Sequence, residues 1–171
     1  MSKNQSMRYK KDDEYCTPLN AVKIIEKYLK PKSRILCPFD KDDSNFVIYL
    51  KEKGHTVVNT HIDYGQDFFK MNVKSHFDYI ISNPPFSKKT QVFEKLKRLG
   101  IPYAMLINLV GICDSKKRFE YFKDENFNII YISPRIAYIK DGKQTMGSMF
   151  QSGYVTCNML DGNKFEILGE Y

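Results

Sequence analysis

Two kinds of hydrophobic pattern alternate along this chain, one typical of strands and one typical of helices. Short runs rich in β-branched residues predict strands, which span 34–39, 55–62, 78–82, 103–109 and 127–133. Between them, apolar positions three and four residues apart predict helices, which span 18–31, 42–54, 88–99 and 114–123. Strands that alternate with helices indicate βαβ units. We therefore expect an α/β fold with a mainly parallel, doubly wound sheet.

Capping residues mark where these helices begin and end. Thr17 is expected as the N-cap of the first helix, with Pro18 at its first helical position. The polar run Asp42-Asp43-Ser44 is expected to cap the second helix. Gly54 and Gly100 are expected to end the second and third helices, because glycine readily adopts the left-handed conformation that closes a helix.

Two final apolar runs, 154–160 and 165–168, have no helix between them. They are joined by Asp161, Gly162 and Asn163, residues that are typical of tight turns. We predict a C-terminal antiparallel hairpin at one edge of the sheet.

The chain shows no internal repeat and no linker of biased composition. Residues 1–14 carry alternating charges and little apolar content, which predicts a mobile tail. Residues 15–171 are then expected to form a single domain, because their number suits one hydrophobic core.

Charge and composition narrow the class of protein. The net charge of +7 and the pI near 9.1 favour a polyanionic partner. No apolar run approaches the ~20 residues of a membrane span, and the N-terminus lacks the apolar core of a signal peptide. We expect a cytoplasmic protein with no membrane partner. The four cysteines are far apart and lack zinc-ligand spacing, so reduced thiols and no metal site are expected.

The clearest candidate for chemistry is Asn83-Pro84-Pro85-Phe86, directly after a predicted strand. In a doubly wound sheet, ligands bind beyond the carboxyl ends of the strands. The Asn83 amide oxygen and the Pro84 carbonyl form an acceptor pair for an exocyclic amine, and successive prolines hold that carbonyl outward. Phe86 offers an aromatic face to an extruded base. The alternative is a simple turn after a buried strand.

The run D-Y-I-I-S-N-P-P-F resembles the [DNS]-P-P-[YFW] motif of the amino-type adenine-N6 DNA methyltransferases, particularly the short forms of phages and mobile elements. The resemblance extends from about residue 15 to residue 154. It implies a Rossmann-like S-adenosylmethionine-dependent methyltransferase fold, with S-adenosylmethionine as cofactor and DNA as substrate. Asn83, Pro84, Pro85 and Phe86 would then be the catalytic residues.

The same resemblance implies a set of cofactor-binding residues. Tyr15 and Thr17 are similar to a Thr-Pro element that contacts the methionine part, and Asp67-Phe68 is similar to an element that binds the cofactor's adenine. The full set is Tyr15, Thr17, Cys37, Pro38, Phe39, Asp40, His61, Asp67 and Phe68. In the first loop, Cys37 replaces the family's acid, and charged residues stand at 41–43 where glycines are expected. At the end of the second strand, His61 stands in place of the ribose-binding acid; the alternatives are that Asp63 takes this role or that His61 is an ordinary surface histidine.

Basic residues near the motif are candidates for contacts with nucleic acid phosphates. They are Lys88, Lys89, Lys116, Arg118 and Arg135. The long segment 134–151 is polar and basic, and long loops are often functional. A solvated helix face is the alternative for the lysines at 88–97. No segment is large enough for a separate target-recognition domain, so recognition falls to loops, a second copy or a partner subunit.

The sequence also allows substrates other than DNA and a function other than catalysis. An N-P-P-F motif also suits adenine in RNA or the amide of a protein glutamine, since each target is a planar nitrogen. The altered first loop equally allows a non-catalytic nucleic-acid-binding relative that has lost its cofactor.

Overall fold

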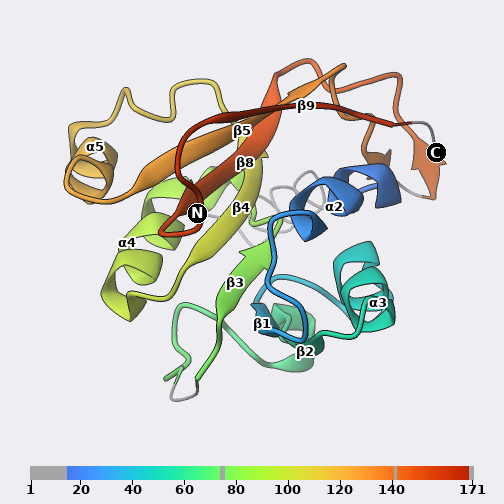
Figure 1. Ribbon diagram of the computed structural model, residues 1–171, viewed down its shortest axis with the longest axis horizontal. Coiled ribbons are helices and arrows are strands. Elements are labelled where there is room, and N and C mark those ends of the chain that lie inside the picture. The colour runs from blue at the N-terminus through green and yellow to red at the C-terminus, as the bar shows by residue number, and fades with distance from the viewer. Residues whose placement is uncertain (1–14, 74–75, 141, 170–171) are drawn as a thin grey trace, which may run out of the picture.

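The structure, a computed structural model, describes residues 15–73, 76–140 and 142–169. A seven-stranded sheet with the strand order β2-β1-β3-β4-β8-β5-β9 runs through the molecule (Figure 1). Its strands are β1 (Arg34–Cys37), β2 (Thr56–Asn59), β3 (Tyr79–Ser82), β4 (Tyr103–Asn108), β5 (Phe127–Ser133), β8 (Ser152–Cys157) and β9 (Lys164–Ile167). The expected tail, residues 1–14, and the last two residues of the expected domain lie outside the described residues.

Helices cover both faces of the sheet. They are α2 (Leu19–Glu26), α3 (Asn45–Glu52), α4 (Lys89–Leu99) and α5 (Lys116–Phe122). In Figure 1, α2 and α3 lie on one side of the sheet, and α4 and α5 lie on the other. A separate hydrophobic cluster fills the space under each pair, one around Ile25 and Phe46, the other around Phe93 and Leu96. The predicted doubly wound α/β architecture is therefore confirmed.

Strand β8 is the one antiparallel member of the described sheet. It pairs antiparallel with both β4 and β5, whereas the remaining pairs in the sheet are parallel. All six residues of β8 are buried, because neighbouring strands flank it and the sheet's two faces are both covered. The sheet is mainly parallel, as the sequence predicts.

The predicted hairpin between the last two strands is wrong. Strand β9 pairs in parallel with β5, so β5 lies between β8 and β9. The physical reason lies in burial: a strand buried on both faces belongs in the interior of a sheet, and β8 fills that place. The alternating exposure of β9 suits an edge instead. The Asn163 side chain also accepts from the Ile129 amide at 2.9 Å, which holds the segment before β9 against β5.

The helix ends agree with the sequence except at α2. Ser44 accepts from the Phe46 amide at 3.2 Å, and Gly54 and Gly100 have the left-handed φ angles of 86° and 65°. The prediction that Thr17 caps α2 is wrong. Pro18 is the N-cap residue in an extended conformation, so the helix begins one residue later and Thr17 is buried without capping it.

The parallel strands β1, β3, β4, β5 and β9 all end at the same edge of the sheet. The segment 134–151 emerges there and forms a small hairpin of β6 (Ile139–Lys140) and β7 (Lys143–Gln144). Cys16 joins this hairpin, because its amide and carbonyl exchange hydrogen bonds of 2.9 and 3.0 Å with Ile139. Two segments far apart in the chain thus meet beside the motif that follows β3.

Candidate active site

Asn83 lies directly after β3 with one half of its amide paired. Its Nδ2 donates to the Tyr15 carbonyl at 3.1 Å. Its Oδ1 is buried and has no hydrogen-bond partner among the described residues. A buried acceptor without a donor costs about 1–3 kcal/mol and calls for a specific explanation. Asn83 therefore holds an unsatisfied acceptor at the end of β3.

Aromatic rings form one wall beside this amide. Phe86 packs edge-on against Phe150, with ring centroids 5.3 Å apart, and against Tyr138 at 6.3 Å. Tyr15 packs against Tyr138 at 5.8 Å. These contacts fix the Phe86 ring in the segment that follows Asn83. Tyr138 belongs to the segment 134–151, which the sequence makes a candidate for contacts with the target, whereas Phe150 and the packing of both rings on Phe86 were not predicted.

Further hydroxyls without partners are buried at the same edge. Neither the Thr17 Oγ1 nor the hydroxyls of Tyr138 and Ser152 have a hydrogen-bond partner among the described residues. Burial raises the pKa of Tyr138, and the nearby Ser152 hydroxyl opposes that rise, although the two oxygens do not meet in hydrogen-bonding geometry. Buried polar groups normally have partners, so a ligand or bound water is expected to satisfy these hydroxyls.

Asp40 links the loop after β1 to the strand that leads into the motif. Its carboxylate accepts from the Ser44 hydroxyl at 2.5 Å and from the Ser82 hydroxyl. Burial raises the pKa of Asp40 to about 6, although both hydroxyl contacts act to lower it. A negative charge at this position is costly unless a cation or more donors arrive.

Cys37 and Pro38 precede Asp40 and are buried. Burial is also the main cause that raises the pKa of the Cys37 thiol, so this side chain is a neutral member of the core rather than a substitute for the acid it replaces. The Pro38 carbonyl accepts from the Thr60 hydroxyl at 3.2 Å. Cys37 and Pro38 thus anchor the loop that contains Asp40 to the buried core.

Phe39 and Phe68 bring the loop after β1 together with the segment after β2. Their ring centroids are 5.2 Å apart at an interplanar angle of 75°, and Phe68 is 2% exposed. The Asp67 carboxylate accepts from the Phe69 amide at 3.0 Å. A groove of about 290 Å³ lies beside Asp67 and Phe69, against α4. The predicted adenine-binding pair is therefore next to the predicted first loop.

His61 lies just after β2, as the sequence predicts, and caps the short helix η1 (Ile62–Tyr64). Its Nδ1 accepts from the Asp63 amide at 3.1 Å. The Asp63 carboxylate in turn forms an ion pair with Lys41 at 2.8 Å. Lys41 stands where the resemblance to the adenine-N6 methyltransferases implies a glycine. Its ion pair with Asp63 links the loop after β1 to the segment after β2.

The predicted phosphate-binding residues fall into two groups. Lys89 donates to the Asn108 carbonyl at 2.8 Å, and burial lowers its pKa. Arg118 donates to the carbonyls of Gly111 and Ile112 at 2.6 and 3.0 Å, and to Thr90 at 3.1 Å. These two cations hold the segment between β4 and α5.

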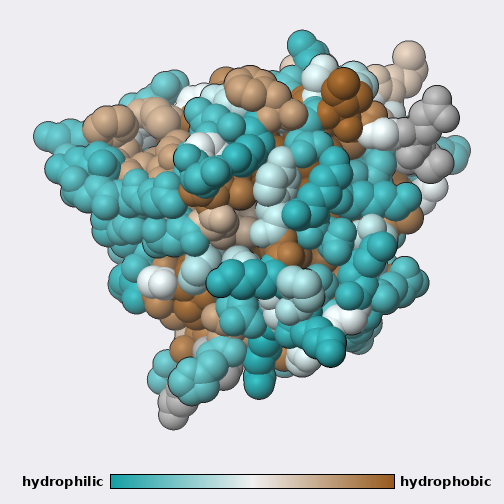
Figure 2. Space-filling model, viewed as in Figure 1, coloured by the Kyte–Doolittle hydropathy of each residue, from teal (hydrophilic) through white to brown (hydrophobic). Residues whose placement is uncertain are grey.

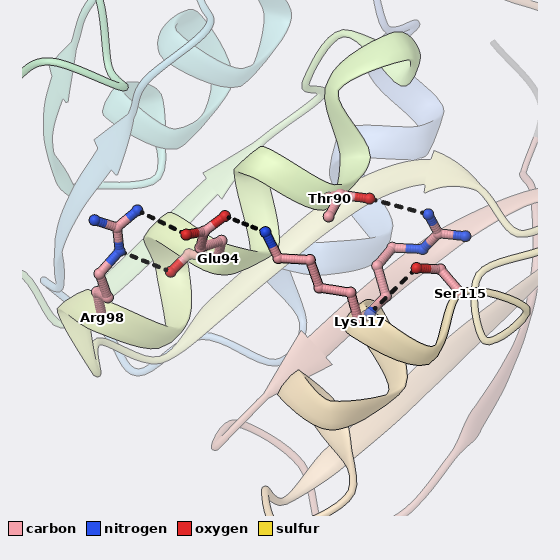
Figure 3. Close-up of polar contacts among 6 residues, drawn as sticks. Thr90, Glu94, Arg98, Ser115 and Lys117 are labelled. Atoms are coloured by element: carbon pink, nitrogen blue, oxygen red, sulfur yellow. Dashed lines mark hydrogen bonds and ion pairs between the residues drawn. The ribbon is translucent and has the colours of Figure 1, made fainter.

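Lys88 lies 5.2 Å over the Phe69 ring, on the side of the groove. Lys116 and Arg135 are exposed. Nearby, Glu94 bridges Arg98 and Lys117 at 3.4 and 3.2 Å and so connects α4 with α5 (Figure 3). Hydrophilic side chains cover the surface between these helices, at the left of Figure 2. Arg98 and Lys117 on this face are thus paired with Glu94.

Among the described residues there is neither a metal-binding cluster nor a membrane-spanning helix. In 15–73, 76–140 and 142–169, no group of three or more His, Cys, Asp or Glu side chains is arranged to hold a metal ion. None of the helices in these ranges combines the length and apolar character that crossing a bilayer requires.

No protein-family model matches the sequence, and neither does any curated protein sequence. Solved structures do match. A modification subunit of a putative type I restriction enzyme from Vibrio vulnificus YJ016 superposes with a TM-score of 0.60 at 10% identity, over 94% of this chain and 48% of that one. This chain therefore spans about half the length of that subunit.

A second similar structure is a TehB-like SAM-dependent methyltransferase from Corynebacterium glutamicum ATCC 13032 Kitasato. It superposes with a TM-score of 0.51 at 12% identity, over 82% of this chain and 88% of that one. The seven-stranded sheet with an antiparallel strand among parallel ones matches the fold of S-adenosylmethionine-dependent methyltransferase structures. The predicted Rossmann-like methyltransferase fold is confirmed.

Proposed function

We propose that this protein transfers a methyl group from S-adenosylmethionine to the N6 amino group of adenine in DNA. The observation that carries the proposal is the buried, unpaired Oδ1 of Asn83, adjacent in the chain to the Pro84 carbonyl at the end of β3. Adenine N6 is a poor nucleophile, because its lone pair is delocalised into the ring. Two acceptors on its N–H groups return electron density to the nitrogen and hold it in place.

Phe86 supports this role from the side. Its ring is fixed by Phe150 and Tyr138, so it offers a preorganised face to an extruded base. No dedicated base is required in the chain, because the methylated amine is strongly acidic and water takes its proton. Catalysis then consists of positioning and electrostatics.

The residues around Asn83 fit the cofactor. The Thr17 hydroxyl has no hydrogen-bond partner among the described residues and is available to the cofactor. A cation such as the ammonium of the cofactor's methionine part would stabilise the ionised form of the buried Asp40 carboxylate. Asp67 and the paired rings of Phe39 and Phe68 suit the cofactor's adenine. When bound, S-adenosylmethionine supplies an electrophilic methyl group on its sulfonium.

Charge and structural similarity favour DNA as the substrate. The chain carries a net charge of +7, and Lys116 and Arg135 are exposed cations. The similar subunit from Vibrio vulnificus is described as part of a restriction enzyme's modification machinery. A second copy or a partner subunit for target recognition belongs to the same proposal.

The test is transfer of a tritiated methyl group to double-stranded DNA, with modified adenine identified after digestion. Asn83→Ala should abolish transfer, and Phe86→Ala should reduce it strongly while Phe86→Tyr retains it. Asn126→Ala is the matched control, because it also loses an asparagine-to-carbonyl hydrogen bond, of 2.8 Å, but precedes β5 at the opposite edge. Full activity of both Asn83→Ala and Phe86→Ala would refute the assigned roles. If the methyl group is transferred only to adenine in RNA, or only to protein glutamine, then that molecule is the substrate in place of DNA.

One observation favours a second candidate, a non-catalytic nucleic-acid-binding relative. Both oxygens of Asp40 already accept from serine hydroxyls, and Lys41 is committed to Asp63. A thermal shift with S-adenosylmethionine separates the two candidates, because a ligand at a hundredfold excess over its Kd stabilises the fold by about 2.7 kcal/mol. DNA binding without any such shift would favour the second candidate.

A further inference from the structure

A second cavity, of about 390 Å³, opens at the same edge of the sheet as Asn83. Asn20, Pro134, Arg135, Ala137, Met146 and Leu168 line it. Ser133 ends β5 and Ile167 ends β9, and both strands are parallel to β3. The cavity therefore faces the side of the molecule on which a DNA bound at the motif would lie.

The segment 134–151 connects this cavity to the motif. Pro134, Arg135 and Met146 of this segment line the cavity, while its Tyr138 and Phe150 pack on Phe86. Strand β5 is three strand intervals from β3 in the sheet order. At about 4.8 Å per interval the separation is roughly 14 Å. That distance corresponds to about four stacked nucleotides at 3.4 Å each.

The chemistry of the cavity combines apolar walls with one buried polar group. Asn20 is 3% exposed, and its Nδ2 donates to the Gly169 carbonyl at 3.0 Å. Its Oδ1 is buried and, like that of Asn83, has no hydrogen-bond partner in the described part of the chain. Pro134, Ala137 and Leu168 add apolar surface against which a flat ring can pack. The one polar atom of Asn20 without a partner, Oδ1, is thus a hydrogen-bond acceptor.

Arg135 provides a charge at the cavity. It is exposed and forms no hydrogen bond or ion pair with any other described residue, in contrast to Lys89 and Arg118, which donate to backbone carbonyls. A free guanidinium beside an apolar cavity suits a nucleotide, whose phosphate and base need both features.

We propose that this cavity binds a base of the DNA within about four nucleotides of the target adenine, with Asn20 Oδ1 accepting from the base's exocyclic amino group and Arg135 contacting a neighbouring phosphate. The inference rests on the proposed function and adds a recognition site to it. Adenine, cytosine and guanine carry an exocyclic amino group, whereas thymine carries none. The site should therefore discriminate against thymine at one position.

The experiment selects bound duplexes from a pool with a fixed adenine and randomised flanks, and sequences them. It uses the full chain without cofactor, so that binding is read independently of methyl transfer. The wild-type protein should deplete thymine at one flanking position. Asn20→Leu should lose that depletion and weaken binding of the selected sequence by roughly 5- to 150-fold.

Arg135→Gln provides a second, surface variant. It should weaken binding to all sequences and lower the slope of log affinity against log salt by about one. Lys23→Gln, an exposed change of equal charge on α2, is the control and should leave the base preference unchanged. Melting temperatures establish that each variant is folded.

Each outcome has a separate consequence. If the wild-type protein binds DNA but shows no flanking preference, or if Asn20→Leu keeps the preference, the recognition site is refuted and the proposed function stands. If Arg135→Gln keeps the full salt slope, the phosphate contact is refuted. If the wild-type protein binds no DNA, both this inference and the proposed function are overturned.

Discussion

Asp40 has the most unusual environment of the candidate site residues. Its carboxyl group is enclosed, accepts from two serine hydroxyls, and has a pKa of about 6 because burial outweighs those contacts. In the unfolded chain the same group has its ordinary pKa of 3.8. Folding stability must therefore depend on the ionisation of this single residue.

The first prediction follows from the direction of that shift. Between about pH 4 and pH 6 the unfolded chain ionises this carboxyl while the folded protein keeps it protonated, and above pH 6 both states are ionised. Stability should therefore fall from about pH 4 to about pH 6 and level off above that. Relative to Asp40→Asn, the wild-type protein should lose on the order of 3 kcal/mol between pH 4 and pH 7. Denaturant unfolding across this range measures it, and a constant difference would contradict the prediction. Asp43→Asn, at an exposed position, controls for the lost charge.

Asp67 carries the second prediction at this scale. Asp67→Ala should weaken S-adenosylmethionine binding with little change in DNA affinity, because its carboxylate lies beside the Phe39–Phe68 pair. Calorimetry with the cofactor and fluorescence anisotropy with DNA measure the two effects. Asp161→Ala, a charge removed at the opposite edge of the sheet, should alter neither. An equal loss of both affinities in Asp67→Ala would point to misfolding instead.

At the scale of elements, two helices begin with the same serine cap. Ser44 accepts from the Phe46 amide before α3, and Ser115 accepts from the Arg118 amide before α5. Only Ser44 also donates to Asp40. One residue thus fixes both a helix terminus and the candidate cofactor loop.

The matched pair of variants separates these two effects. Ser44→Ala and Ser115→Ala should each cost about 1 kcal/mol of stability, the usual value of an N-cap. Ser44→Ala should in addition raise the pKa of Asp40, because a hydrogen bond that lowers it is removed. Its cofactor affinity should also fall, while that of Ser115→Ala stays unchanged. Equal cofactor affinities in titrations of the two variants would disprove the link between cap and loop.

The elements also mark how far the sequence could predict the structure. The N-P-P-F motif, its preceding strand and the Ser44 cap follow from local rules, so the periodicity and the capping residues identify them. The roles of Tyr138 and Phe150 depend on how segment 134–151 folds back onto Phe86, which no local spacing encodes. Whether Lys89 and Arg118 face solvent or backbone carbonyls is likewise decided by tertiary packing.

At the scale of the whole molecule, the central position of β8 depends on a glycine. A Cβ atom on Gly153 would lie 2.5 Å from the Ile130 carbonyl oxygen in β5, closer than atoms can approach. Gly153→Ala must therefore move backbone within the centre of the sheet. The sequence shows which runs form strands, and on that basis it predicts a hairpin at this end of the chain. It does not show which strands can pack as neighbours, because that depends on close contacts such as the one at Gly153.

The corresponding prediction compares two glycines. Gly153→Ala should destabilise the fold by about 3 kcal/mol or more, because the clash is with backbone in a buried strand. Gly162→Ala should change stability by less than about 1 kcal/mol, since nothing lies within 4 Å of the added Cβ. Thermal unfolding of the two variants measures the contrast, and similar melting temperatures would show that β8 tolerates a side chain there.

The place of β8 between β4 and β5 also bears on how the protein is made. On the ribosome, β4 and β5 emerge before the strand that must join them, and neither can use the other as its neighbour. The nascent chain holds two unfilled strand edges until residues 152–157 have been synthesised. A chain that ended anywhere before them would hold a split sheet, so β1 with its loop at Asp40 and the aromatic residues that pack on Phe86 cannot be joined in one sheet until β8 has formed.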